Sequence, residues 1–254
     1  MGDVLLVACG GGANSALSKA DIPISPMMAI SRENGTISID DKELIRKGMA
    51  NYRVVIPFCI LGGQVSTDIV REVIRCARAE GCKVVSVLGI PLEMEADRRE
   101  RALRNLSDVV ALSDCCLAFD MQRSMDVFME TYVDRKFDFF FMMIDRLIVT
   151  SINAIKDCLD GPFFTVFKDK LYAFASCNDV LTVNAVVKAW NLMLFDNNTE
   201  KDGLVILVSA RTSSAEMDAI RDRAVRELGI MPEVMRRTDS DDSKVIVFRS
   251  VSSF

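Results

Sequence analysis

Runs of apolar residues alternate with helical stripes through the first 160 residues of the chain. The run at 3–9 is continuous and ends at glycines, which is typical of a parallel strand covered on both faces. Similar runs occupy 53–61, 83–91 and 114–120. Between them, apolar residues recur every three or four positions, as on one face of a helix. The alternation predicts an α/β fold with a doubly wound, mostly parallel sheet.

The segments between these strands are mostly predicted as helices. One helix is expected to begin near Ala13 or Asn14, and a short one at 41–48. The helix after the second strand is expected to stop at Gly81. Residues 21–35 contain two prolines, so they are predicted to form a loop.

One long apolar helix is predicted at 137–159 and is broken by Gly161 and Pro162. Asp145 and Arg146 fall at its centre, where charges in a lipid bilayer would be costly. We therefore expect a central helix buried in a globular protein and no membrane span.

The pattern changes after this helix and predicts a second, mixed α/β domain. The first expected domain is 1–160, which is nucleotide-binding-like and ends in the central helix. The second expected domain is 161–254. The expected elements of the second domain are a strand-like segment at 163–176, a helix at 178–194, a strand at 203–210, a helix at 214–229, and a pair of strands at 231–239 and 243–250 joined by the acidic residues 239–242.

Composition narrows the chemistry. The 254 residues carry a net charge of −5 with Lys and Arg spread along the chain, which disfavours nucleic acid as a main partner. The absence of histidine excludes Ser-His-Asp and Cys-His catalysis and His-ligated metals. Eight cysteines without a C-x-x-C pair, and no basic and apolar leader pattern, favour a reduced, cytoplasmic protein.

The glycine run Gly10, Gly11 and Gly12 follows the first strand directly. Backbone amides at a strand-to-helix turn, aided by the helix dipole, can bind a phosphate. Glycines can also serve only close packing, so both interpretations stay open here. The run has neither the Walker A sequence nor the full G-x-G-x-x-G spacing.

A second glycine turn, Gly62 and Gly63, follows the second strand. Two such turns at the carboxyl ends of neighbouring strands can face one ligand. After the third strand, Glu95 and Arg99 lie four residues apart at the start of a helix and are expected to share one face, where they could form an exposed ion pair. The two residues are either ligand contacts or a solvated surface pair, and both interpretations stay open here.

Taken in order, these motifs resemble those of the tubulin/FtsZ family. "GGGANSAL" is similar to the family's first phosphate loop, and "ILGGQVSTDIV" occupies the place of the signature G-G-G-T-G-[TS]-G, from which Gln64, Val65 and Thr67 depart. The resemblance implies that a guanine nucleotide contacts residues of both loops, namely Gly10, Gly11, Gly12, Asn14, Gly62, Gly63 and Ser66.

Two further motifs extend the resemblance. "IPLEMEADRR" resembles the stretch "PFxFEGxxR", which would make Glu95 a ribose contact and Arg99 a nucleotide contact. "FMMID" resembles "AFxxAD", so Phe141 and Asp145 would lie against the guanine. The run 137–159 looks like the family's central helix, and "GLVILVSA" resembles part of its second domain.

Departures from the family concern the outer phosphates and hydrolysis. The chain between Asn14 and the second strand is shorter than in the family. The family's catalytic loop N-x-D-x-x-D aligns with "GPFFTVFKD", where Phe164 and Val166 replace the asparagine and the first aspartate and Asp169 alone keeps a carboxylate. Phenylalanine and valine cannot orient or deprotonate water, so hydrolysis is expected to be slow or absent.

The resemblance implies a divergent FtsZ/tubulin-like cytoskeletal protein that binds GTP or GDP weakly or not at all, with Mg²⁺ as a candidate ion. Its expected partners are other copies of itself or a fuller FtsZ-like protein, and cell division is the family's usual process. One alternative is an active GTPase with a misaligned loop, in which Asp157, Asp160 or Asp169 supplies carboxylates. Another is an unrelated Rossmann-like enzyme that binds a different nucleotide.

Overall fold

The structure is a computed structural model that describes residues 2–19, 26–31, 38–131, 137–159, 163–167, 171–178, 182–191, 203–237 and 244–251. The chain divides into two compact units, residues 1–149 and 150–254. The division falls inside α6 (Phe137–Cys158), the long helix that the apolar run predicts. The domain limits 1–160 and 161–254 stay predictions.

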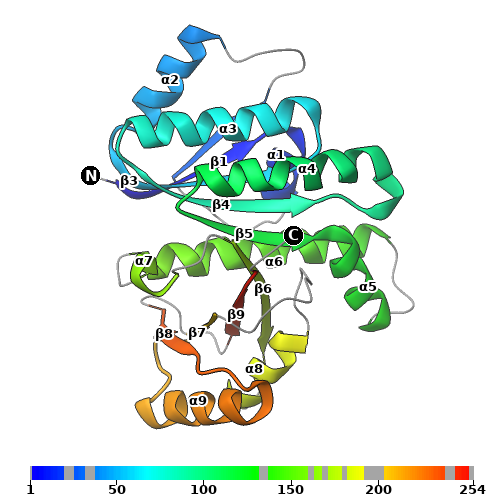
Figure 1. The fold of residues 1–254 in the computed structure, drawn as a ribbon, viewed down its shortest axis with the longest axis vertical. Helices are drawn as coiled ribbons and strands as arrows, with labels where there is room; N and C mark the ends of the chain where they lie inside the picture. The colour runs from blue at the N-terminus through cyan, green and yellow to red at the C-terminus, as the bar shows by residue number, and fades with distance from the viewer. Residues whose placement is uncertain are drawn as a thin grey trace. The chain divides into compact units, whose positions relative to one another are not determined.

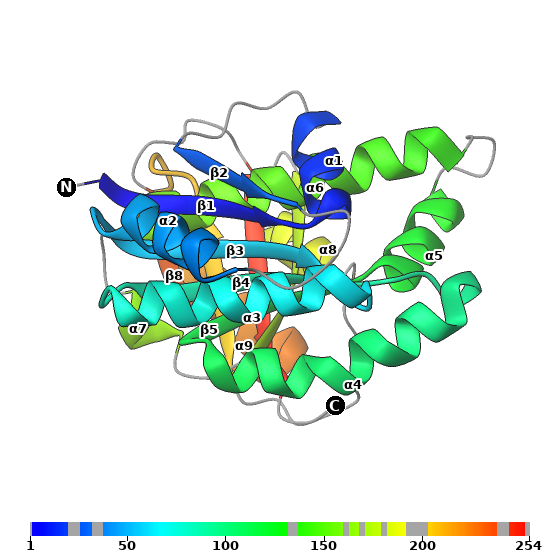
Figure 2. The ribbon, with the colours of Figure 1, turned by 90° about the horizontal axis from the view of Figure 1, so that it is seen from above.

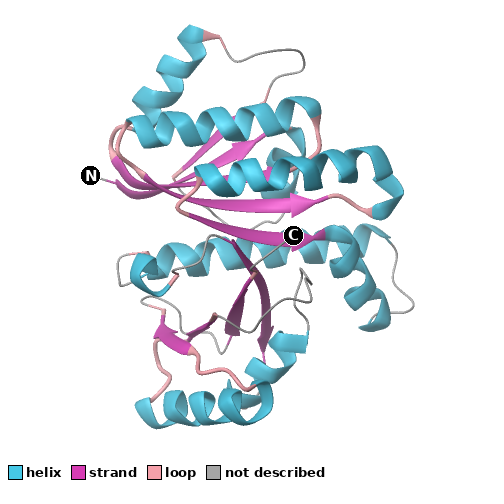
Figure 3. Ribbon diagram, viewed as in Figure 1, coloured by secondary structure: helices cyan, strands magenta, loops and turns pink. Residues whose placement is uncertain are grey.

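A parallel sheet forms the centre of the first unit (Figure 3). Its strands are adjacent in the order β2-β1-β3-β4-β5. Their bounds are β1 Gly2–Cys9, β2 Met27–Ile30, β3 Tyr52–Ile60, β4 Lys83–Ile90 and β5 Cys115–Asp120. The inner strands are buried almost throughout, which explains why they appear in the sequence as continuous apolar runs.

Helices cover both faces of this sheet (Figures 1 and 2). Helices α3 and α4 lie on one side with α2 beside them, and α1 lies on the other side. The bounds are α1 Gly11–Lys19, α2 Ile39–Met49, α3 Gln64–Ala79, the 3₁₀ turn η1 Glu93–Glu95, α4 Ala96–Leu112 and α5 Met121–Thr131. The predicted doubly wound α/β arrangement is confirmed.

The prediction of a loop throughout 21–35 is wrong at Met27–Ile30, which forms the strand β2 parallel to β1. Pro26 precedes the strand and accepts the Leu6 N–H through its carbonyl at 3.2 Å. A proline at the start of an edge strand loses no ladder hydrogen bond, so Pro26 is compatible with the strand.

The second unit contains a mixed sheet with the strand order β6-β9-β7-β8. Strand β9 is antiparallel to β6 and to β7, and β8 is parallel to β7. The bounds are α7 Phe163–Val166, β6 Leu171–Asn178, α8 Thr182–Asn191, β7 Leu204–Val208, α9 Ser214–Leu228, β8 Glu233–Arg236 and β9 Lys244–Ser250.

Two predictions for this unit are wrong. Residues 163–166 form the short helix α7, although 163–176 was expected to be strand-like throughout. Strands β8 and β9 do not pair with each other, because β7 lies between them. The apolar run Val245–Phe248 is fully buried and needs neighbours on both sides, whereas β8 has exposed ends and suits the edge.

Aromatic side chains fill the core of the second unit. The Phe163 and Phe167 rings stack with their centroids 4.1 Å apart. Tyr172 and Phe248 meet Phe167 edge-on at 5.0 and 5.1 Å. Helix α7 therefore contributes an aromatic side chain to the hydrophobic core, which explains why phenylalanine occurs in this short helix.

The cluster generates a stability prediction. Phe163→Ala should lower the free energy of unfolding by about 3–5 kcal/mol, because it leaves a cavity beside Phe167. Phe164→Ala, in the same short helix, should cost less, because Phe164 is only half-buried. Urea denaturation of the two variants checks this order, and equal losses would contradict the assignment of Phe163 to the core.

Candidate functional site

The two glycine turns meet at the carboxyl edge of the first sheet. Cys9 and Cys59, which end β1 and nearly end β3, are register partners, so the turns that follow them start side by side. Gly10 has a φ of +90°, and a Cβ placed on it would lie 2.7 Å from the Cβ of Ser66. The first turn thus packs directly against the start of α3.

Packing accounts for most of the glycines at this edge. A Cβ on Gly62, whose φ is +82°, would lie 1.9 Å from the carbonyl oxygen of Arg98. A Cβ on Gly63 would lie 2.6 Å from the Ser66 hydroxyl oxygen. That hydroxyl lies 3.3 Å from the carbonyl oxygens of both Ile60 and Gly63, so it stabilises its own turn.

Gly11 differs from its neighbours because a Cβ on it would meet no atom within 4 Å. A Cβ on Gly12 would have ordinary contacts, with Ile60 at 3.4 Å and with the Arg98 Nη2 at 3.9 Å. The first amides of any helix lack intrahelical partners, and the α3 N-terminus at Gly63 has no side-chain cap. The open space beside Gly11 therefore lies next to backbone donors suited to an anion.

Asn14 carries a second signal on α1. Its side-chain oxygen Oδ1 is buried and has no hydrogen-bond partner among the described residues. Its backbone N–H donates to the Gly10 carbonyl at 3.1 Å, so the residue is fixed to the glycine turn. A buried acceptor without a partner is uncommon and suits a hydroxyl or N–H donor supplied by a ligand.

Of the two interpretations of Glu95 and Arg99, the mutual ion pair is wrong. Glu95 instead accepts a hydrogen bond from the Arg98 Nη1 at 2.7 Å. Arg99 donates to both carboxylate oxygens of Asp120, at 2.8 and 2.6 Å, and to the Pro91 carbonyl at 2.7 Å. Glu95 ends the turn η1 and precedes α4, so regular helical spacing does not apply between it and Arg99.

Asp120 is a residue that the sequence interpretation missed. Besides Arg99, it accepts the backbone N–H of Gln122 at 2.9 Å and thus caps the start of α5. The Asp120 carboxylate raises the pKa of Arg99. A carboxylate that ends an apolar run just before a helix is the signal that could have identified it. The guanidinium of Arg99 is therefore occupied by its ion pair with Asp120.

Phe141 and Asp145 lie one turn apart on α6 in the first unit. The Phe141 side chain is 37% exposed. Burial raises the pKa of Asp145, and the positive charge of Lys19 at the end of α1 partly opposes the shift. The structure therefore brings Asp145 near the C-terminal end of α1, whose N-terminal end carries Gly11 and Gly12. Asp169 lies outside the described residues.

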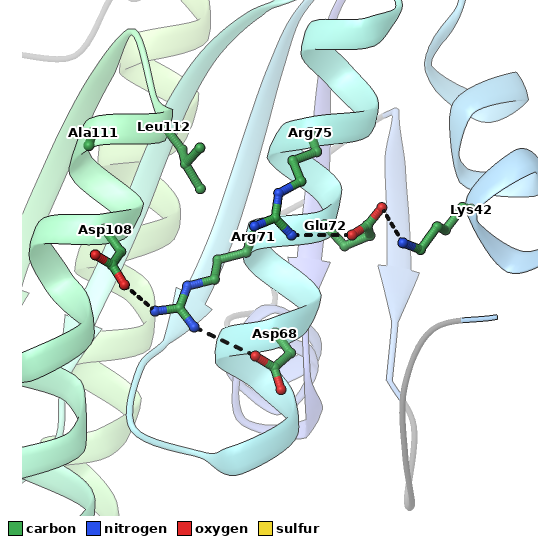
Figure 4. Close-up of a pocket in the computed structure, with 8 residues that line it drawn as sticks. All are labelled: Lys42, Asp68, Arg71, Glu72, Arg75, Asp108, Ala111 and Leu112. Carbon is green, nitrogen blue, oxygen red and sulfur yellow. Dashed lines mark hydrogen bonds and ion pairs between the residues drawn. The ribbon is translucent and has the colours of Figure 1, made fainter. Parts of the chain in front are cut away.

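A separate hollow of about 780 Å³ lies on the α3–α4 face (Figure 4). Arg71 pairs with Asp108 at 2.7 Å and lies 3.6 Å from Asp68. Glu72 pairs with Lys42 at 3.0 Å and with Arg75 at 3.4 Å. Each charge in the hollow has an opposite partner, so these pairs join α3 to α4 and α2 and leave no net charge for a ligand.

The two cysteines that precede the glycine turns are not reactive thiols, and the described ranges contain no metal cluster. Burial raises the pKa of Cys9 well above its ordinary value and that of Cys59 to about 12, so neither thiol is a nucleophile at neutral pH. No group of three His, Cys, Asp or Glu side chains there is arranged to hold a metal ion. None of the described helices is long and apolar enough to cross a membrane.

The chain has a parallel sheet with two glycine turns at its carboxyl edge, a long helix and a second mixed α/β unit. Together these features correspond to the FtsZ/tubulin fold. The chain matches an FtsZ from M. jannaschii described as an empty dimer, with TM-score 0.73 and 16% identity over 99% of this chain and 89% of that one. A point mutant of M. jannaschii FtsZ gives TM-score 0.74 and 14% identity over 98% and 90%.

CetZ from Methanosaeta thermophila strain DSM 6194 gives TM-score 0.70 and 13% identity over 100% of this chain and 88% of that chain. No family model and no curated protein matches the sequence. At these identities the likeness establishes the fold. The resemblance drawn from the sequence motifs is confirmed at that level, with sequence divergence that fits a distant relative.

The contact between Gly62 and α4 generates a second prediction. Gly62→Ala should destabilise the protein by about 1–3 kcal/mol more than Gly81→Ala, because only the first adds a Cβ against backbone. Both glycines have positive φ, +82° and +77°, so Gly81→Ala is a control for backbone strain alone. Urea denaturation measures the difference, and equal costs would argue against tight packing of this turn.

Asp145 generates a prediction about pH. The pKa of Asp145 is higher in the folded protein than the ordinary value of 3.8. As the pH rises past 3.8, this carboxyl therefore loses its proton in the unfolded chain before it does so in the folded protein, and this difference favours unfolding. Relative to wild type, Asp145→Asn should therefore gain stability as the pH rises above about 3.8, until the folded-state carboxylate has ionised as well. The control Asp138→Asn changes an exposed carboxylate on the same helix. Thermal melts across pH check this, and a flat difference for Asp145→Asn would contradict it.

Proposed function

We propose that this chain is a divergent FtsZ/tubulin-like cytoskeletal protein that binds a guanine nucleotide weakly, self-associates, and hydrolyses little GTP. The observation that carries the proposal is the open space at Gly11 near the start of α3, which has no side-chain cap, at the edge where α/β sheets bind ligands. The fold of FtsZ and CetZ supports it.

The phosphate end of the nucleotide is assigned to the two glycine turns. The amides at the starts of α1 and α3 supply donors, and the Gly10–Ser66 contact holds the two helix starts together. Mg²⁺, if bound, would be held mainly by the phosphates themselves, since the described residues offer no metal cluster.

The base end of the nucleotide is assigned to α6, and the length of α1 sets the distance between the phosphate end and the base end. Helix α1 has nine residues, so Gly11 and Lys19 are about 12 Å apart along its axis. That length suits a nucleotide with phosphates at Gly11 and its base near Asp145. The Asp145 carboxylate would accept N–H groups of guanine, Phe141 would contact the ring, and the unpartnered Asn14 Oδ1 would accept a ribose or base donor.

Binding is proposed to be weak because two predicted contacts are already occupied. The Ser66 hydroxyl is engaged by carbonyls of its own turn. Arg99 is held by Asp120 through two hydrogen bonds. A nucleotide would gain little from either side chain, since it would first have to break an existing interaction.

Low hydrolysis is proposed from the chemistry of α7, which lies in the stretch that aligns with the family's catalytic loop. Its residues Phe163–Val166 contain no carboxylate or amide side chain, and Phe163 is buried in the aromatic core. A water molecule could not be deprotonated by these residues. The self-association that we propose is suggested by the FtsZ described as a dimer. Sedimentation velocity of this chain with GDP or GTP tests it, and a monomer at all concentrations would contradict it.

A charge substitution at Gly11 tests nucleotide binding. Gly11→Asp should lower GDP affinity by about tenfold or more, because it places a negative charge next to the phosphates. Gly11→Asn is the matched control with the same shape and no charge, and its loss should be much smaller. Both variants should fold normally, since a Cβ at Gly11 meets nothing within 4 Å.

Isothermal titration calorimetry with GDP measures these affinities, and mass analysis of small molecules that co-purify gives an independent check. Equal affinities in wild type and Gly11→Asp would remove the first glycine turn from the site. A dinucleotide that co-purifies with the protein would favour the Rossmann-like alternative.

A further inference from the structure

The side chain of Arg98 lies between the two glycine turns. Its Nη2 is 3.9 Å from the position of a Cβ on Gly12, and its Cγ is 3.0 Å from that of a Cβ on Gly62. Burial raises the pKa of Cys59 under these turns, and the Arg98 charge opposes the shift. A positive charge therefore lies at the place where the phosphates are assigned.

Arg98 already has a carboxylate partner within the chain. Its Nη1 donates to the Glu95 Oε1 at 2.7 Å, three residues earlier. The Arg98 and Glu95 side chains are 34% and 35% exposed, so water and solutes reach the pair. An ion pair of this exposure contributes little stability and can exchange one anion for another.

The neighbouring arginines are not available in the same way. Both terminal nitrogens of Arg99 donate to Asp120, and one of them also donates to the Pro91 carbonyl. The Arg101 Nε donates to the Gly62 carbonyl at 3.1 Å. Of these three arginines on α4, Arg98 is the one that combines a partly exposed carboxylate partner with a position beside both turns.

We propose that Glu95 acts as an internal counter-ion of Arg98, and that a polyphosphate anion entering between the glycine turns replaces Glu95 on the guanidinium. The inference rests on the proposed function for the nucleotide as ligand, and it assigns the phosphate contact to Arg98 in place of Arg99. Phosphate and carboxylate both match the planar donor array of an arginine, so they compete for it.

This exchange weakens anion binding between the two glycine turns, because Glu95 competes with the anion for Arg98. The resting protein neutralises its own cation, and an incoming anion must displace Glu95 before it gains the charge-assisted hydrogen bonds of Arg98. Removing the Glu95 charge should thus strengthen binding of a polyphosphate that has no ribose. Loss of a simple ribose contact at Glu95 would leave such binding unchanged.

The test is calorimetric titration of the full chain with tripolyphosphate and, separately, with GDP. Glu95→Gln should raise tripolyphosphate affinity about two- to fivefold, the equivalent of an exposed ion pair. Arg98→Ala should lower it about tenfold or more. The controls Glu100→Gln and Arg104→Ala make the same charge changes in the exposed pair on the same helix and should have little effect. Thermal melts verify folding of every variant.

The outcomes separate this inference from the proposed function. If tripolyphosphate does not bind, or binds equally to wild type, Glu95→Gln and Arg98→Ala, the counter-ion exchange is overturned, even where GDP binds. If tripolyphosphate binds with the expected order and GDP does not bind, the exchange stands and the guanine-nucleotide function falls. Equal gains from Glu95→Gln and Glu100→Gln would reduce the effect to net charge and overturn the exchange.

Discussion

The absence of room for a side chain at Gly10 and Gly62 is the constraint on which the carboxyl edge of the first sheet depends. A Cβ on Gly10 would overlap Ser66 at 2.7 Å, and one on Gly62 would overlap the α4 backbone at 1.9 Å. The close approach brings the starts of α1, α3 and α4 together around one place. Packing and anion binding are therefore compatible explanations of the same glycines, since the contacts that exclude side chains also gather backbone donors.

The sequence predicted the elements of the first unit well because buried parallel strands and amphipathic helices have distinct apolar periods. It failed where the deciding contact is distant in the chain. Strand β2 exists because β1 pairs with it, although Pro26 directly precedes it. Helix α7 has aromatic residues that are typical of a strand, but its Phe163 stacks on Phe167, which in turn contacts Phe248. Chain order suggested that β8 pairs with β9, and burial of β9 decided otherwise.

The candidate site shows the same limit. Glycine turns are local features, so their positions could be predicted from the residues alone. The partners of Glu95 and Arg99 could not, because the turn η1 shifts the helical phase and Asp120 approaches from another strand. The half-buried state of Asp145 also depends on its tertiary surroundings, which the apolar pattern of α6 does not specify. Motif spacing thus suggests where a site would lie, and tertiary contacts decide which of the side chains there remain available to a ligand.

The position of β9 has a consequence for how the second unit is made. β9 lies between β6 and β7, yet it follows both in the chain. During synthesis, β6 and β7 leave the ribosome without the strand that joins them, and each keeps an unsatisfied edge until residue 250 has emerged. Nascent chains that stall before this point would expose two apolar strand edges to neighbouring chains, which makes chaperone protection most valuable in this interval.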